Sequence, residues 1–201
     1  MSTPGMPKKW RVISYIDGYN LYHGIREAGW RRFLWLDLVA LSGTLIRGGQ
    51  ELVKTKYFTT RITAPEEKRK RQSDYIEALA AHCGNQVEMF WGHYQNESWS
   101  CRKCGAQEVV PHEKKTDVNI AVEMMVDAYA DAFDTALLIS ADSDLVPPIR
   151  AIKRLFGNKR VVVAFPPNRH SVELRAVAHG GGFEIGRAKL AGSQMPEIVR
   201  K

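Results

Sequence analysis

One uninterrupted apolar segment limits the folds open to this chain of 201 residues. Residues 135–140 (T-A-L-L-I-S) carry no charge and show no alternation of polar and apolar positions. Such a strand is typical of the centre of a parallel sheet that is covered on both faces. Asp142 and Asp144 follow at once, in A-D-S-D-L. The segment therefore predicts a central strand that ends in carboxylates.

Strand and helix patterns alternate along the chain. Strands are expected at residues 12–16, 53–60, 86–91, 135–140, 160–165 and 182–185. Helices are expected at residues 19–28, 36–46, 65–82, 116–129, 145–156 and 171–178. This order predicts an α/β fold, a three-layer sandwich with a mostly parallel, doubly wound central sheet and a small cysteine-containing insert. The expected parts are a flexible N-terminal tail at 1–8, one domain at 9–190 with its insert at about 92–113, and a C-terminal tail at 191–201.

Carboxylates stand at the ends of three strand-to-helix units. Asp17 follows the first strand, Asp117 opens the helix at 116–129, and Asp142 and Asp144 follow the central strand. The carboxyl ends of parallel strands meet at one edge of the sheet, where open α/β folds place their sites. Carboxylates gathered there repel one another unless a cation such as Mg²⁺ or Mn²⁺ holds them. The pattern favours a metal-dependent phosphodiesterase.

Each of these acids also has a purely structural interpretation. An aspartate directly after a strand often caps the following helix, as Asp142 or Asp144 could for the helix at 145–156. The pair D-S-D supplies two carboxylates where one cap suffices, which favours a site over a cap.

Charge and cysteine content narrow the class of protein. The chain has 29 Lys and Arg against 22 Asp and Glu, a net charge of +7. A basic surface around an acidic cleft suits a polyanion such as RNA or DNA, although many proteins carry such charge for solubility alone. No apolar stretch approaches about 18 residues, so neither a membrane span nor a membrane partner is expected. Three cysteines cannot all pair internally, which favours a reducing cytoplasm.

Three motifs in sequence order resemble those of the NYN branch of the PIN-like ribonucleases. They are Y-I-D-G-Y-N at 15–20, K-K-T-D-V-N-I-A-V-E at 114–123 and L-L-I-S-A-D-S-D-L-V-P-P-I at 137–149, joined by S-V-E-L-R at 171–175. The resemblance covers roughly residues 11–185. It implies an endonuclease that uses Mg²⁺ or Mn²⁺ and acts mainly on single-stranded RNA.

The resemblance also implies residue roles. The catalytic, metal-holding acids would be Asp17, Asp117, Asp142 and Asp144. One ion would lower the pKa of a bound water and a second would stabilise the leaving 3′ oxygen, so products would carry 5′-phosphate and 3′-hydroxyl ends. His179 stands where the family often has an acidic residue, so either a second metal position is weakened or that acid is dispensable. The expected substrate contacts are Asn20, Lys114, Lys115, Ser171 and Arg175, of which Asn20 could instead be a turn residue and the lysines solvated.

The insert contains the spacing of a zinc knuckle, C101-R-K-C104-G. Two thiolates are half of a tetrahedral zinc site, and the neighbouring candidates for the other half are Cys83, His93 and His112. A zinc ion, a degenerate knuckle, a site shared between subunits and two free thiols all stay open. The aromatic run F90-W-G-H-Y94 could stack on unpaired bases, but packing is the commoner use of such rings. The basic run K68-R-K-R71 is either a phosphate contact or a solvated helix face.

Two other functions stay open. The first is a binding module with a vestigial acidic pocket, which binds RNA or a regulatory protein partner without cutting it; a homodimer is compatible with the sequence. The second is a metal-dependent phosphatase, against which the missing D-x-D pair at D17-G-Y counts.

Overall fold

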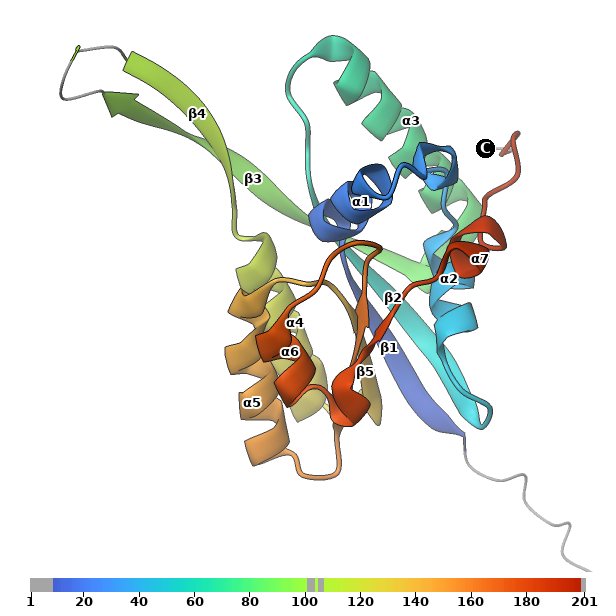
Figure 1. The fold of residues 1–201 in the computed structure, drawn as a ribbon. Helices are drawn as coiled ribbons and strands as arrows, with labels where there is room; N and C mark the ends of the chain where they lie inside the picture. The colour runs from blue at the N-terminus through green and yellow to red at the C-terminus, as the bar shows by residue number, and fades with distance from the viewer. Residues whose placement is uncertain (1–8, 101–103, 105–106, 200–201) are drawn as a thin grey trace, which may run out of the picture.

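The computed structural model describes residues 9–100, 104 and 107–199, with side chains described throughout except at 93–100 and 107–114. Seven strands form one sheet in the order β4-β3-β2-β1-β5-β6-β7. All neighbouring pairs are parallel except β3 and β4. Helices lie on both faces of the sheet (Figure 1). The predicted α/β sandwich with a doubly wound sheet is confirmed.

The bounds of the elements follow the predicted alternation. The strands are β1 (Trp10–Asp17), β2 (Gln50–Thr60), β3 (Val87–Ser100), β4 (Gln107–Lys114), β5 (Thr135–Ile139), β6 (Arg160–Phe165) and β7 (Phe183–Glu184). The helices are α1 (Gly18–Glu27), α2 (Leu38–Leu45), α3 (Glu66–Cys83), α4 (Thr116–Tyr129), α5 (Val146–Leu155), α6 (Val172–Val177) and α7 (Arg187–Ala191). Short 3₁₀ turns lie at Arg31–Phe33, Gly84–Gln86, Ser143–Leu145 and His179–Gly181. The sequence predicted α4 and β6 to the residue and missed β4 and α7.

The sheet separates two apolar cores because successive side chains of a strand point to opposite faces. On β1, Val12 and Ile16 pack with α1, α2, α3 and α7, whereas Ile13 and Tyr15 pack with α4, α5 and α6. Every residue of β5 is buried, as expected for a strand covered on both faces. Burial of these two cores is the main source of stability.

A buried ionic network fastens α4 to the sheet. Lys56 of β2 lies 2.7 Å from carboxylate oxygens of both Glu123 and Asp127. The hydroxyl of Tyr15 donates to Asp127 at 2.6 Å. Burial, with the charge of Asp127 beside it, raises the pKa of Tyr15. The position of α4 relative to β1 and β2 is therefore fixed by polar contacts as well as by packing.

The insert predicted at about 92–113 forms a long hairpin. β2 pairs with Val87–Gly92 of β3, and the rest of β3 pairs with β4 instead. Figure 1 shows this arm leaving the body of the domain. Within the predicted cysteine knuckle, Cys104 is an exposed turn residue between β3 and β4, and residues 101–103 lie outside the described part of the chain.

The chain after α7 packs back onto the domain. The backbone nitrogen of Met195 donates to the carbonyl of Trp35 at 2.9 Å. The indole nitrogen of Trp35 donates to the carbonyl of Pro196 at 2.9 Å. Met195 is buried in the α2-side core, so the segment expected as a C-terminal tail contacts the body. The expected N-terminal tail at 1–8 lies outside the described residues. In the part of the chain that the structure describes, no helix combines the length and apolarity needed to cross a bilayer.

Candidate functional site at the carboxyl edge

The site begins where β1 turns into α1. Asp17 is only 1% exposed and caps α1: its Oδ1 accepts from the backbone nitrogen of Asn20 at 2.9 Å. Its Oδ2 accepts from the side-chain amide of Asn20 at 2.6 Å. Gly18 makes the turn possible, since a Cβ there would lie 2.7 Å from the carbonyl oxygen of Phe58. The motif D-G-Y-N therefore builds a tight turn that holds the Asp17 carboxylate, with Asn20 supporting it.

Ser140 joins two of the predicted acids. Its buried hydroxyl donates to Asp17 Oδ2 at 2.8 Å and accepts from the backbone nitrogen of Asp142 at 3.0 Å. The register of β1 and β5 pairs Ile16 with Ile139, so Asp17 and Ser140 follow in step on adjacent strands. Ser140 was not predicted as a site residue. The available signal was a polar side chain closing an otherwise apolar strand.

Asp142 also has the capping role that was its structural alternative. Its Oδ1 accepts from the backbone nitrogen of Asp144 at 3.0 Å and caps the 3₁₀ turn Ser143–Leu145. Asp144 itself is exposed at the start of that turn. Capping and site membership are thus not exclusive: the cap holds Asp142 beside the Ser140 hydroxyl.

Asp117 approaches the same edge from the other side of β1. Thr60 ends β2 and Thr116 opens α4, and their buried hydroxyl oxygens lie 3.3 Å apart. This contact anchors the first turn of α4, which carries the half-buried Asp117, at the carboxyl edge. The four predicted acids therefore belong to one edge of the sheet, with Asp17 on the strand between the other two groups.

The spacing of these acids decides which metal sites are feasible. Among the described side chains, no three His, Cys, Asp or Glu residues form a group that could hold a metal ion. The edge is therefore not a three-carboxylate cage. Mg²⁺ usually keeps several waters and takes one or two protein carboxylates, and Mn²⁺ favours the same oxygen ligands. The all-oxygen donor set fits such a hydrated ion.

Arg169 reaches this edge from the loop after β6. Its guanidinium donates to Asn20 Oδ1 at 3.3 Å and to Glu27 Oε1 at 2.6 Å. The hydrogen bond from Arg169 lowers the pKa of Glu27. Gly24 lets α1 approach the loop, since a Cβ there would lie 2.8 Å from the Cβ of Pro166. No motif in the sequence distinguished Arg169 from the other basic residues.

Exposed rings cover the outer side of α1; we name Tyr19, Tyr22, His23 and Arg26 the α1 aromatic face. Tyr19 and Tyr22 are 48% and 42% exposed. The ring centroids of Tyr19 and His23 are 4.2 Å apart, and those of Tyr22 and His23 are 5.3 Å apart. The Arg26 guanidinium lies 5.3 Å from the Tyr22 centroid. The helix that Asp17 caps thus presents a surface suited to stacking.

The predicted substrate contacts have diverse surroundings. Lys115 is exposed and precedes α4 with a positive φ of 75°, whereas the side chain of Lys114 lies outside the described residues. Ser171 caps α6 by accepting from the backbone nitrogen of Leu174 at 3.1 Å. Arg175 lies over the Phe165 ring at 4.9 Å and donates to the Gly181 carbonyl at 3.3 Å. Ser171 and Arg175 therefore have local structural contacts, and no described contact links either one to the acids.

His179 lies at the opposite edge of the sheet. Its Nδ1 accepts from the backbone nitrogen of Val161, near the start of β6, at 2.9 Å. Burial, together with the charges of Lys153 and Arg160, lowers the pKa of His179. The interpretation that His179 leaves a gap in the metal site is wrong, because the length of β6 separates it from the carboxyl edge.

The predicted zinc ligands do not converge on Cys83. This thiol is buried at the end of α3 and donates to Asp37 Oδ1 at 3.5 Å; burial raises its pKa to about 12. β3 has 14 residues and lies between Cys83 and the knuckle, a span of about 45 Å. The prediction of a zinc site that combines Cys83 with Cys104 of the same chain is therefore wrong. The remaining candidates have side chains outside the described set: Cys101, His93 and His112.

The basic run and the aromatic run lie near the carboxyl edge. Residues 68–71 are exposed on the half of α3 that follows β2, with Arg69 in an ion pair with Glu66 at 3.2 Å. Phe90 stacks on Phe58 with centroids 4.8 Å apart, so this ring packs into the body. Arg61 lies over the Trp91 ring at 4.3 Å.

Comparisons with known proteins agree with this architecture. A crystal structure of a protein of unknown function from Vibrio parahaemolyticus matches with a TM-score of 0.57 at 20% identity, covering 92% of this chain and 98% of that one, which shows the fold alone. The 6-hydroxy-3-succinoylpyridine 3-monooxygenase HspA of Pseudomonas putida (strain DSM 28022 / S16) is 27% identical over 225 residues, 94% of this chain and 71% of the relative. The NYN domain model matches residues 11–181. This chain therefore belongs to the NYN domain family, a branch of the PIN-like nuclease fold.

Proposed function

We propose that this chain is an endoribonuclease that cleaves single-stranded RNA with Mg²⁺ or Mn²⁺. Family membership supports a nuclease, and one contact supports an acidic site shared by two strands. The hydroxyl of Ser140 connects Asp17 of β1 with Asp142 after β5. Capping of two helices would not require these strand ends to contact each other, whereas a shared acidic site does.

Asp17 and Asp142 would hold the cation, with Asp117 and Asp144 at the margins of the site. When bound, the cation would lower the pKa of a water molecule and stabilise charge on the leaving 3′ oxygen. Asn20 and Ser140 hold the Asp17 carboxylate in one orientation through three hydrogen bonds. Arg169 holds Asn20 in turn, so its effect on the reaction is one of positioning.

The surroundings support a single-stranded substrate. Unpaired bases expose faces that stack on aromatic rings, whereas bases in a duplex are already stacked on their neighbours. The α1 aromatic face starts two residues after Asp17 and offers such rings. The exposed cations at residues 68–71 of α3 would contact the phosphates, since α3 follows the carboxyl end of β2.

The relative named as a monooxygenase favours a second candidate, hydroxylation of a pyridine compound. It aligns with 94% of this chain, although at only 27% identity. Such a reaction inserts one oxygen atom of O₂ and reduces the other to water, so it needs a two-electron donor. The assay is incubation with 6-hydroxy-3-succinoylpyridine, O₂ and a reduced nicotinamide or flavin, followed by mass spectrometry.

The deciding experiment measures cleavage of a 5′-labelled RNA strand in Mn²⁺, with EDTA as the metal-free arm. Asp142→Asn keeps an oxygen that caps the turn at Ser143–Leu145 but removes the charge. We expect it to lower the rate at least about 100-fold. The matched control is Asp37→Asn, because Asp37 also caps a helix, accepting from the backbone nitrogens of Val39 and Ala40.

The outcomes separate the candidates. Metal-dependent products with 5′-phosphate ends, lost in Asp142→Asn and retained in Asp37→Asn, support the nuclease. Equal cleavage by all variants points to a contaminant and favours the binding module. A hydroxylated pyridine without RNA cleavage favours the chemistry named for the relative, and phosphate release from small monoesters favours a phosphatase.

A further inference from the structure

A cavity of about 430 Å³ opens at the amino edge of the sheet. It lies between the starts of β1, β5 and β6, the segment after α2, and the glycine-rich loop before β7. Val12, Leu137 and Val162 form an apolar floor on three adjacent strands. The polar and aromatic side chains around this floor include Trp10, Arg47, Gln50, Arg160, His179 and Phe183.

The cavity is cationic. Among the described residues that line it there is no Asp or Glu, and within the described chain neither Arg47 nor Arg160 has an ion-pair partner. His179 Nδ1 lies 2.9 Å from the backbone nitrogen and 3.2 Å from the carbonyl oxygen of Val161, so the backbone of β6 holds this ring at the cavity wall. Uncompensated donors around an apolar floor favour an anionic ligand over a neutral one.

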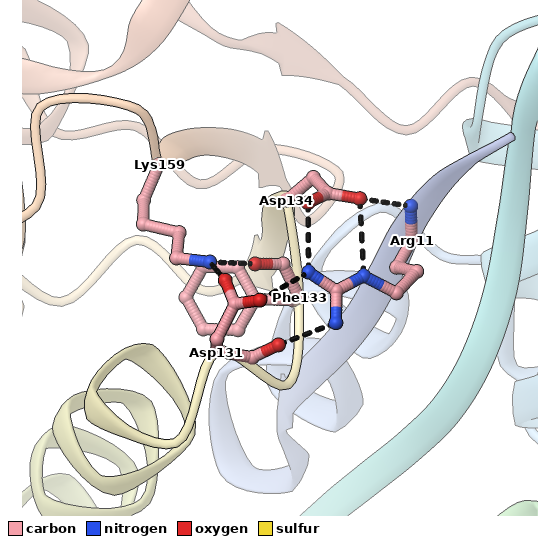
Figure 2. A network of polar contacts seen from close by, with 5 residues as sticks. All are labelled: Arg11, Asp131, Phe133, Asp134 and Lys159. Atoms are coloured by element: carbon pink, nitrogen blue, oxygen red, sulfur yellow. Dashed lines mark hydrogen bonds and ion pairs between the residues drawn. The ribbon is translucent and has the colours of Figure 1, made fainter. Parts of the chain in front are cut away.

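A polar network joins the start of β1 to the segments that precede β5 and β6 (Figure 2). The backbone nitrogen of Arg11 donates to Asp134 Oδ2 at 2.7 Å, and its guanidinium donates to Asp134 Oδ1 at 2.9 Å. Lys159 donates to the carbonyl of Phe133 at 2.6 Å and pairs with Asp131. On β1, Arg11 lies between the cavity-lining residues Trp10 and Val12, so its side chain points to the face opposite the cavity.

We propose that this cavity binds a small ligand that combines a planar ring with one anionic group. The ring of the ligand lies over the apolar floor between Trp10 and Phe183, and its anionic group is bound by Arg160 and Arg47 beside the His179 ring. The volume falls within the range of about 300–1,000 Å³ that is typical of small-molecule sites. The eight residues of β1, about 25 Å, separate it from Asp17, so this site is distinct from the nuclease edge.

Two sources supply this ligand chemistry: a nucleoside monophosphate, as RNA degradation releases, and an aryl carboxylate. The experiment is calorimetric titration of the whole protein with uridine 5′-monophosphate and with 3-phenylpropionate, beside inorganic phosphate and uridine as half-ligands. We expect one of the two complete ligands to bind at least about tenfold more tightly than either half-ligand. The tighter of the two identifies the source.

Single substitutions test whether the ligand binds in this cavity. Arg160→Gln should lower the affinity for the ligand at least about tenfold. Arg154→Gln, which replaces an exposed arginine on α5, should leave the affinity unchanged. Circular dichroism checks that both variants fold. Asp142→Asn should bind normally, which distinguishes this cavity from the nuclease edge. In the wild type, the ligand should also raise the His179 pKa, measured by NMR titration. The proposal is overturned if no probe binds, if phosphate alone binds as well as the complete ligands, or if Arg160→Gln matches the wild type.

Discussion

The two edges of the parallel sheet are built from the same strands but use their polar residues differently. At the carboxyl edge, Asp17 and Ser140 contact each other across β1 and β5, directly at the surface where chemistry is proposed. At the amino edge, Arg11 and Asp134 also join β1 to β5, but they lie behind the cavity. The contact at the carboxyl edge involves a residue of the proposed site, whereas the contact at the amino edge joins strand starts. A polar cross-strand pair alone therefore does not mark a site.

After the loss of Asp142, the next largest difference between the edges is expected from removing the Ser140 hydroxyl. Ser140→Ala takes the shared partner from Asp17 and Asp142, so we expect RNA cleavage to fall about 10- to 100-fold, the usual cost of losing an outer positioning contact. Stability should fall by about 1–3 kcal/mol, since buried polar groups lose their partner. Initial rates in Mn²⁺ and urea unfolding measure the two effects.

Ser42→Ala is the matched control for that prediction. Ser42 is equally buried, and its hydroxyl contacts Ser14 at 2.9 Å and the Leu38 carbonyl at 2.8 Å. It should lose comparable stability and keep full cleavage activity. A comparable loss of activity in both variants would mean that cleavage follows stability, and that the carboxyl edge has no special dependence on Ser140.

The packing of α1 against the loop after β6 gives the next effect. Gly24→Ala places a Cβ 2.8 Å from the carbonyl oxygen of Pro167 and should destabilise the protein by about 1–3 kcal/mol. Gly43→Ala, within α2, meets no atom within 4 Å and should stabilise it by about 0.5–1 kcal/mol. Urea unfolding of both variants tests this contrast. Two changes of the same sign would show that the α1 contact is not the cause.

Tyrosine substitutions compare an exposed ring near the carboxyl edge with one near the amino edge. In an Asp142→Asn background, Tyr19→Ala should raise the Kd for single-stranded RNA about 5- to 10-fold, because a stacked base contributes about 1–3 kcal/mol. Tyr129→Ala, at the far end of α4 and 85% exposed, should not change it. Fluorescence anisotropy measures both. Equal affinities in the two variants would remove the α1 aromatic face from RNA binding.

Much of this comparison was accessible from the amino-acid sequence, and the reasons are physical. The apolar run at 135–140 predicted a central strand, and the parallel topology then placed Asp17, Asp117, Asp142 and Asp144 at one edge. The Ser140 link required the register of β1 on β5, which no local pattern specifies. His179 was expected at the wrong edge. After β6 ends at the carboxyl edge, α6 leads the chain back, and His179 contacts Val161 near the start of β6. The β3–β4 arm was predicted only as an insert, because β3 continues past its pairing with β2 and pairs with β4 instead.

The last prediction concerns an acid titration at the amino edge. The hydrogen bond from Arg11 lowers the pKa of Asp134 to about 2. Because this value lies below the ordinary one of 3.8, the ion pair stabilises the protein fully above about pH 4, and that contribution is lost as the pH falls towards 2. Asp134→Asn should therefore lower stability by about 1 kcal/mol at pH 7 and by almost nothing at pH 2.

Thermal unfolding at pH 7, 4 and 2 measures this convergence. The comparison variant is Glu66→Gln, which removes an exposed pair with Arg69 and should change stability little at any pH. If the gap between the wild type and Asp134→Asn stays constant from pH 7 to 2, the Arg11 contact is not what holds the strand starts together.

Because Ile16 aligns with Ile139, the activity of the proposed enzyme depends on the correct pairing of β1 with β5. A chain that paired β1 and β5 one step out of phase would turn Ser140 toward the wrong face, and the two acids would lose their common partner. Molecules with the wrong register would then lack cleavage activity instead of cutting RNA without selectivity. For a protein proposed to cut RNA, that coupling would spare the cell from stray damage during folding.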